Sequence, residues 1–324
     1  MERRSSIDLL RIISAIAVVI IHSVSAPISN STIVYSDSLV FNLNLIHILL
    51  NWSVPVFFMI TGYCLLIKEE CTYEYCFTHV IKYLCVLSTV GLFYSLLEEI
   101  FVFKDINIAI ITQSVKNVIE GKLWDHMWFV YAIIGVYLVM PVIHNFMEQG
   151  SRNILILTTL LFLFNILFPT VEKQISVGVS FPFSGYLFYV CFGGAVAKLQ
   201  INKKMMTAIY FGGLLSAFWI FLGAKNQKFG YKHLAVCFMA MSIFLIISKI
   251  NIKPNKILLN VSKCTWGIYL IHPLFINIAL KLLNMDLVTS HAYFKLPLFV
   301  MIIFIISFLT TYILRRIPYI KMLF

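Results

Sequence analysis

Two ionisable residues inside the first apolar stretch are spaced so that they can act together. Arg11 and His22 are eleven positions apart. At about 100° per residue, eleven residues make three helical turns plus about 20°, so both side chains lie on one stripe of a helix. At about 1.5 Å per residue, His22 lies roughly 16 Å further along that helix than Arg11. Because ionisable side chains are costly in lipid, we expect both to face the bundle interior or a wet cavity.

The chemistry that these two residues offer is proton transfer beside an anion. A neutral imidazole takes up protons near pH 7, so His22 could act as a general base on a hydroxyl, or as a transient acyl carrier. Arg11 could contact an anionic substrate or orient His22, and Asp8 could pair with Arg11 three residues away. No carboxylate that could support His22 is evident in any apolar stretch.

A second histidine in an apolar stretch, His272, lies in the run Trp266–Pro273. Pro273 lacks a backbone N–H and so frees a carbonyl near it, which a single buried histidine could simply bind. Two histidines near mid-depth, with Arg11 below them, instead indicate a lined polar cavity. In such a cavity His272 could stabilise an oxyanion or hold the acceptor.

A basic pair follows the second apolar stretch. His79 and Lys82 are three residues apart and therefore neighbours on one helix face. At the inner membrane surface they could meet a phosphate, or they could anchor lipid headgroups.

The outer end of the third and fourth apolar stretches is rich in aromatic and acidic residues. Trp124, Trp128 and Tyr131 are typical of an interfacial aromatic belt. Glu98 and Glu99 precede them at the end of the third stretch, where acidic side chains can simply be solvated.

The elements that must position these residues are membrane helices. Of the 324 residues, 60% are hydrophobic and only 12% are charged, against about 25% charged in soluble domains. The sequence predicts an all-α polytopic membrane protein, a bundle of about ten transmembrane helices forming one domain over 1–324. The ten apolar segments span 7–27, 44–67, 80–102, 127–147, 153–170, 181–199, 205–223, 233–250, 264–284 and 296–314.

Charged residues in the connections indicate the orientation. Placing both termini in the cytoplasm puts all six arginines on the inner side, as the positive-inside rule requires. The net charge of +11 then reflects inner loops that meet membrane lipids, and no nucleic-acid-binding motif is present. The first stretch is interrupted by Arg11 and His22, so we expect a retained helix and not a cleaved signal peptide.

Small residues and one amphipathic stretch add further expectations. Gly62 should let another helix approach closely, and Gly193 and Gly194 should mark close helix contacts. Pro55 is expected to kink the second span. The stretch 106–120 has an amphipathic pattern and is expected to lie in the membrane plane.

Four ordered motifs resemble the acyltransferase-3 family of membrane O-acyltransferases. They are the Arg11-x10-His22 pair, the run Pro55–Tyr63, the run Trp128–Tyr131 followed by Tyr137 and Pro141, and the run Tyr269–Pro273. Many members carry an Arg-x-x-Arg pair where this chain has His79 and Lys82. Lysine binds phosphate as a point charge without the bidentate fork of arginine.

The resemblance implies that an acyl group, usually acetyl, passes from cytoplasmic acetyl-CoA to a hydroxyl of a cell-surface or lipid-linked glycan at the outer side. Arg11 and His22 would be the acyl-donor and catalytic residues, and Trp128, Tyr269 and His272 would line the cavity. His79 and Lys82 would bind the donor, and no metal is implied. A multi-pass protein of a bacterial inner membrane is the expected setting.

A second function class stays open on the residues alone. A transporter or flippase for a small polar solute, such as an amino acid, would use the same polar cavity as a binding site. His22 would then be a ligand or a proton relay.

Overall fold

The computed structural model describes residues 4–29, 36–67, 71–103, 108–170, 185–285, 287 and 291–324. All regular structure in these ranges is helical. Eight helical segments there are long and apolar enough to cross a membrane. The predicted fold class, an all-α polytopic membrane protein, is therefore confirmed.

The eight long segments coincide with eight of the ten predicted spans. They are Ser5–Ile28, Asp37–Leu66, Tyr73–Phe101, Asp125–Glu148, Ser151–Thr170, Lys203–Gly223, Lys256–Leu282 and Ala292–Leu314. The predicted sixth and eighth spans contain shorter apolar helices, Leu187–Lys198 and Leu234–Ser248. Part of the predicted sixth span, residues 181–184, lies outside the described residues.

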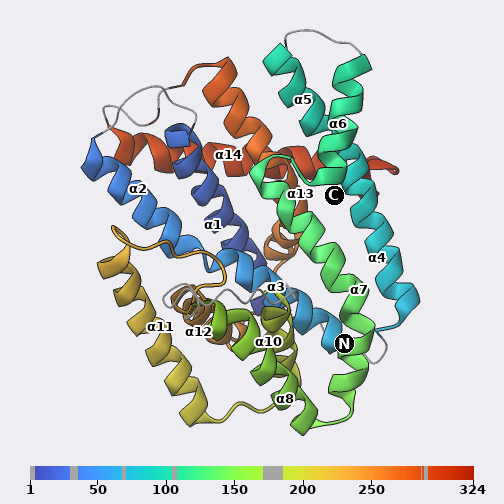
Figure 1. The fold of residues 1–324 in the computed structure, drawn as a ribbon, viewed down its shortest axis with the longest axis vertical. Helices are drawn as coiled ribbons and strands as arrows, with labels where there is room; N and C mark the ends of the chain where they lie inside the picture. Colours follow the sequence, from blue (N-terminus) through green and yellow to red (C-terminus); the bar gives the residue numbers. More distant parts are fainter. Residues whose placement is uncertain are drawn as a thin grey trace. The chain divides into compact units, whose positions relative to one another are not determined.

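The described chain forms two compact units, residues 1–69 with 146–312 and residues 70–145 with 313–324. In the first unit α1 packs against α2, α3, α12 and α13, and Figure 1 shows α2 running alongside α1. The helices of this unit are α1 (Ser5–Ser29), α2 (Asp37–Leu50), α3 (Ser53–Leu66), α8 (Ser151–Phe162), α10 (Leu187–Lys198), α11 (Lys203–Gly223), α12 (Leu234–Ser248), α13 (Lys256–Asn277) and α14 (Ala292–Leu314).

The second predicted span is longer than expected and is broken in the middle. Its two halves, α2 and α3, are separated by a turn at Asn51 and Trp52. Pro55 lies in the first turn of α3, and because proline has no N–H it cannot donate a helical hydrogen bond to the carbonyl of Asn51. Asn51 and Trp52 both keep right-handed helical dihedrals, so the interruption is a local turn one helical turn before Pro55, where a proline disturbs a helix.

Glycines bring α3 and α10 into close contact. A Cβ atom on Gly62 would lie 1.8 Å from the carbonyl oxygen of Val190, and one on Gly193 would lie 1.9 Å from that of Met59. Each glycine thus packs directly against a backbone carbonyl of the other helix, in the space that a side chain would fill. The predicted close contacts at Gly62 and Gly193 are confirmed, and they prove to be two halves of one interface.

The second unit is a smaller helical group. The third of the ten predicted spans lies in this unit and is made of α4 and α5, which are joined by a wider π-helical turn at Leu87–Gly91. An amphipathic helix, α6, packs against α5. The helices are α4 (Tyr73–Val86), α5 (Leu92–Phe103), α6 (Ile108–Glu120) and α7 (Trp128–Glu148), whose last turn belongs to the first unit.

Candidate functional site

One unbroken helix carries both residues of the Arg-x10-His pair. Helix α1 extends from Ser5 to Ser29, so Arg11 and His22 lie on one stripe, about 16 Å apart along the axis. Both side chains are half-buried. Because α1 packs against four other helices, the protein interior surrounds most of this stripe.

His22 contacts His272, the other histidine predicted to lie in an apolar segment. His272 Nε2 lies 2.9 Å from His22 Nδ1, and the ring centroids are 4.9 Å apart at an angle of 44°. His272 is fully buried. Helix α13 thus brings a residue 250 positions away in sequence against the catalytic candidate of α1.

The surrounding carbonyls fix which nitrogen of each neutral ring carries hydrogen. His272 Nδ1 lies 3.0 Å from the carbonyl oxygen of Ile268 and must donate to it. Its Nε2 is then the acceptor, so His22 Nδ1–H donates to it and to the carbonyl of Val18, 3.1 Å away. We assign the tautomers on this network. A neutral His22 therefore carries its basic lone pair on Nε2.

Arg11 is held by residues from two helices. Its Nη1 donates to Asp8 Oδ1 at 3.3 Å, and its Nη2 donates to the sulfur of Cys64 on α3 at 3.2 Å. Asp8 is buried and also accepts from the hydroxyl of Ser262 on α13, at 2.6 Å. These contacts use two of the five N–H donors of the guanidinium, and the side chain is 28% exposed. Arg11 is thus fixed in direction and still partly accessible to a substrate.

Tyr269 lies one turn before His272 on the same helix. Its ring is buried, stacks on Trp266 at 5.6 Å, and lies 6.2 Å from the imidazole of His272. The following Pro273 cannot donate to the carbonyl of Tyr269, which weakens the helix beside the histidine pair. The aromatic wall and the histidine therefore belong to one local structure.

The other predicted site residues lie in the second unit. His79 Nδ1–H donates to the carbonyl of Tyr75 at 2.9 Å, and its ring stacks on Tyr137 at 5.0 Å. Lys82 is half-buried, and its positive charge is repelled by the like charge of Arg315. Trp128 begins α7 and is half-buried. In the first unit His22, Tyr269 and His272 are neighbours, and Arg11 lies about 16 Å from His22 along α1. His79, Lys82 and Trp128 belong to the second unit.

Residues 4–316 match the family model described as an acyltransferase domain, that of the acyltransferase-3 family. The chain belongs to the acyltransferase-3 family. It is thus a multi-pass membrane acyltransferase whose family match extends over both compact units. No curated protein and no solved structure matches the chain.

Several contacts of this acyltransferase carry no signal in the sequence. The apolar stretch around Cys64 predicts a small hydrophobic residue there, yet the sulfur of Cys64 accepts a hydrogen bond from Arg11. Ser262 lies in a polar stretch that is typical of a loop, yet its hydroxyl donates a hydrogen bond to the carboxylate of Asp8. Both contacts join residues on different helices, so no local spacing could have predicted them.

The acidic pair Glu98 and Glu99, in the second half of α5, is also better organised than expected. Glu98 Oε2 accepts from the indole N–H of Trp124 at 3.0 Å. Glu99 Oε1 accepts from the amide of Asn117 on α6 at 2.8 Å. The expectation that these carboxylates are simply solvated was wrong, because neighbouring side chains in the second unit bind both of them.

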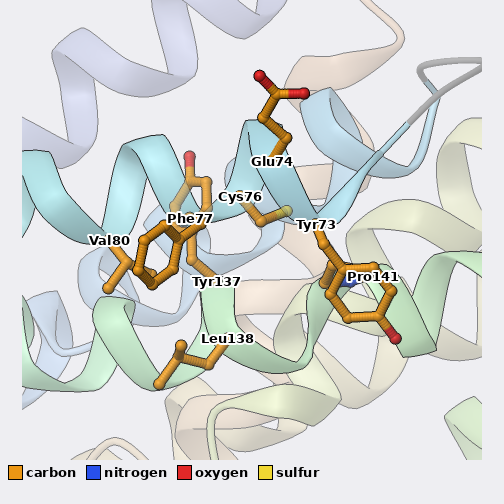
Figure 2. Close-up of a pocket in the computed structure, with 8 residues that line it drawn as sticks. All are labelled: Tyr73, Glu74, Cys76, Phe77, Val80, Tyr137, Leu138 and Pro141. Atoms are coloured by element: carbon orange, nitrogen blue, oxygen red, sulfur yellow. The ribbon is translucent and has the colours of Figure 1, made fainter.

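A cavity of about 310 Å³ opens between α4 and α7 of the second unit. Figure 2 shows Phe77 and Val80 of α4 opposite Leu138 of α7, with Tyr137 between the two helices. Most of the lining is apolar. The cavity therefore suits a hydrocarbon group better than an ion, although His79 stacks on the same Tyr137.

Proposed function

We propose that this acyltransferase moves an acetyl group from acetyl-CoA on the cytoplasmic side to a hydroxyl of a cell-surface or lipid-linked glycan at the outer side. The observation that carries the proposal is the His22–His272 hydrogen bond inside the membrane-spanning part. A base there can be reached by donor and acceptor from opposite faces. Coenzyme A then never crosses the membrane. We propose a bacterial inner membrane as the setting.

His22 is the general base in this mechanism. A sugar hydroxyl is a weak nucleophile until its proton is removed, and the lone pair on His22 Nε2 can take that proton. The positive charge that then develops on His22 is shared through Nδ1–H with His272 and onward to the carbonyl of Ile268. His272 thus does for His22 what a carboxylate does in a Ser-His-Asp triad. It is a positioning residue and not a proton acceptor.

Arg11 is the anion-binding residue of the same stripe. Its remaining donors suit the phosphates or the carbonyl oxygen of an acyl thioester. Asp8 and Cys64 restrict the guanidinium, so less conformational entropy is lost when a substrate binds. We propose that His79 and Lys82 add positive charge for the donor, and that Trp128 and Tyr269 contact substrate.

Substitutions of His272 separate positioning from packing. His272→Leu fills similar space but accepts no hydrogen bond, so His22 loses the group that selects its tautomer. We expect kcat to fall by about 10²-fold or more. His272→Gln restores an acceptor near the position of Nε2 and should recover part of the loss. Equal activity of the two variants, at equal protein levels, would contradict the positioning role.

Labelled donor tests the proposed reaction itself. Membrane vesicles containing the protein receive acetyl-CoA radiolabelled in the acetyl group, and the glycan fraction is then counted. We expect label in the glycan as an alkali-labile ester, and none in vesicles lacking the protein. Uptake of a polar solute without any label transfer would instead support a transporter and overturn the proposal.

A further inference from the structure

The connection between α11 and α12, residues 224–233, is fixed to the first unit at two points. The carbonyl of Phe229 accepts from the side-chain amide of Asn51 at 2.8 Å. The carbonyl of Tyr231 accepts from the hydroxyl of Tyr189, on α10, at 2.5 Å. In the orientation that the charged residues predict, this connection lies on the outer side. Because it is tied to the helices beneath it, it can hold a side chain in a defined place.

Lys232 is the side chain that this connection positions. Its Nζ lies 5.1 Å from the centroid of the Tyr186 ring, within cation–π distance. A Cβ atom on Gly185 would lie 2.8 Å from Cδ and 3.0 Å from Cε of Lys232, so the missing side chain leaves room for the lysine stem. Lys232 and Tyr186 are both only half-buried. An ammonium group carries three N–H donors, so it can bind an anion while it rests on the ring.

Helical register places this lysine at the level of the histidine pair. The hydroxyl of Ser6 donates to the carbonyl of Ser248, the last residue of α12, at 3.2 Å, and α12 packs against α1 in the opposite direction. His22 lies about 24 Å from Ser6 along α1, and Leu234, the first residue of α12, lies about 21 Å from Ser248. The connection that precedes Leu234 therefore lies near the depth of His22.

Tyrosines link Lys232 to that pair. The phenol of Tyr231 lies within electrostatic range of the phenols of Tyr186 and Tyr269. The ring of Tyr269 in turn lies 6.2 Å from the imidazole of His272. Phenols donate and accept hydrogen bonds, as sugar hydroxyls do. A polar path suited to a glycan therefore leads from the outer lysine toward the proposed base.

The charge of the connection indicates which glycans it would attract. Residues 224–233 contain three lysines and no acidic residue. Such a local excess of positive charge raises the concentration of anionic ligands near it. The carboxylate of an acidic sugar and the diphosphate of a lipid-linked sugar both offer the anionic oxygens that an ammonium binds.

We propose that Lys232 binds an anionic group of the acceptor glycan on the outer side of the His22–His272 pair. This inference rests on the proposed function and narrows its acceptor to acidic or diphosphate-linked glycans. Lys232 is then a residue that determines specificity. It holds the acceptor while the hydroxyl to be acylated meets His22, and it takes no part in proton transfer.

The variant Lys232→Met tests this assignment in the full-length protein, because methionine keeps an apolar stem over Gly185 and removes the ammonium. Transfer from labelled acetyl-CoA is measured with three acceptors: a glucuronate-containing oligosaccharide, its carboxyl-reduced counterpart, and that neutral counterpart linked to a polyprenyl diphosphate. A hydrogen bond to a charged group is worth about 10- to 100-fold in affinity. We expect KM to rise by that factor for a charged acceptor, with unchanged KM for the neutral acceptor and for acetyl-CoA. A rise confined to glucuronate identifies a carboxylate, and one confined to the diphosphate identifies the lipid carrier.

Lys228→Met is the matched control. Lys228 belongs to the same connection and is exposed, so its removal lowers the local charge by the same amount. We expect wild-type KM values from it. Unchanged KM of Lys232→Met for both charged acceptors, an equal rise for the neutral one, or equal effects in the two variants would overturn the assignment. If His22→Ala were inactive in that case, the proposed function would stand; a wild-type protein that transfers no acetyl group would remove both.

Discussion

His22→Ala is expected to abolish nearly all acetyl transfer to glycan while the protein still accumulates in the membrane. General-base catalysis contributes about 10²- to 10⁴-fold, and a loss of that size should appear in kcat. The substitution removes the lone pair on His22 Nε2. It also removes the Nδ1–H group that donates a hydrogen bond to His272 Nε2. The measurement is label in the glycan fraction per unit of protein, at saturating acetyl-CoA.

His47→Ala is a suitable control for this variant. His47 is a half-buried histidine of α2 in the same unit, and it has no place in the proposed site. The two variants remove the same side chain from half-buried positions in the same unit. Transfer at the wild-type rate by His22→Ala, or equal losses in both variants, would show that His22 is not the base.

Gly62→Ala is expected to lower the stability of the first unit more than any exposed substitution. The added Cβ atom would lie 1.8 Å from the carbonyl oxygen of Val190 and 2.6 Å from its carbonyl carbon. Both atoms are backbone, so α3 and α10 must move apart. Overpacking of this kind costs about 1–3 kcal/mol, and sometimes more. The thermal midpoint of the detergent-solubilised protein measures the effect, and we expect a clear decrease.

The same substitution at another membrane glycine provides the control. Around Gly135, in α7, the described atoms leave open space where a Cβ would be added. Gly135→Ala should be neutral or slightly stabilising, because alanine is the better helix former by about 1 kcal/mol. If both variants melted alike, the close approach of α3 and α10 would not be what makes Gly62 necessary.

The break in the second span shows where sequence patterns reach their limit. The apolar stretch and Pro55 predicted a kinked helix, and the structure has two helices joined at Asn51 and Trp52. Hydropathy measures how well a segment suits lipid, but it does not show whether the backbone is continuous. Pro55 indicated that the span is interrupted, and the structure places the interruption at Asn51 and Trp52, because a proline withholds the hydrogen bond from the carbonyl one turn before it.

The fold class and the Arg-x10-His stripe were determined by the amino-acid sequence alone. Apolar length selects membrane helices, and within one helix the 3.6-residue period fixes which side chains share a face. The placement of Arg11 and His22 on one side of α1 is therefore a local property. The glycine positions that allow α3 and α10 to approach were also evident from sequence, because a missing side chain is itself the signal.

Only the tertiary structure decided which helices meet and therefore what His22 touches. His272 lies 250 residues away, Cys64 lies 53 residues from Arg11, and Glu98 finds Trp124 across a helix connection. Periodicity within one helix carries no information about its rotation against another helix. That rotation follows from the packing of many side chains at once, and it converts a stripe on α1 into a candidate active site.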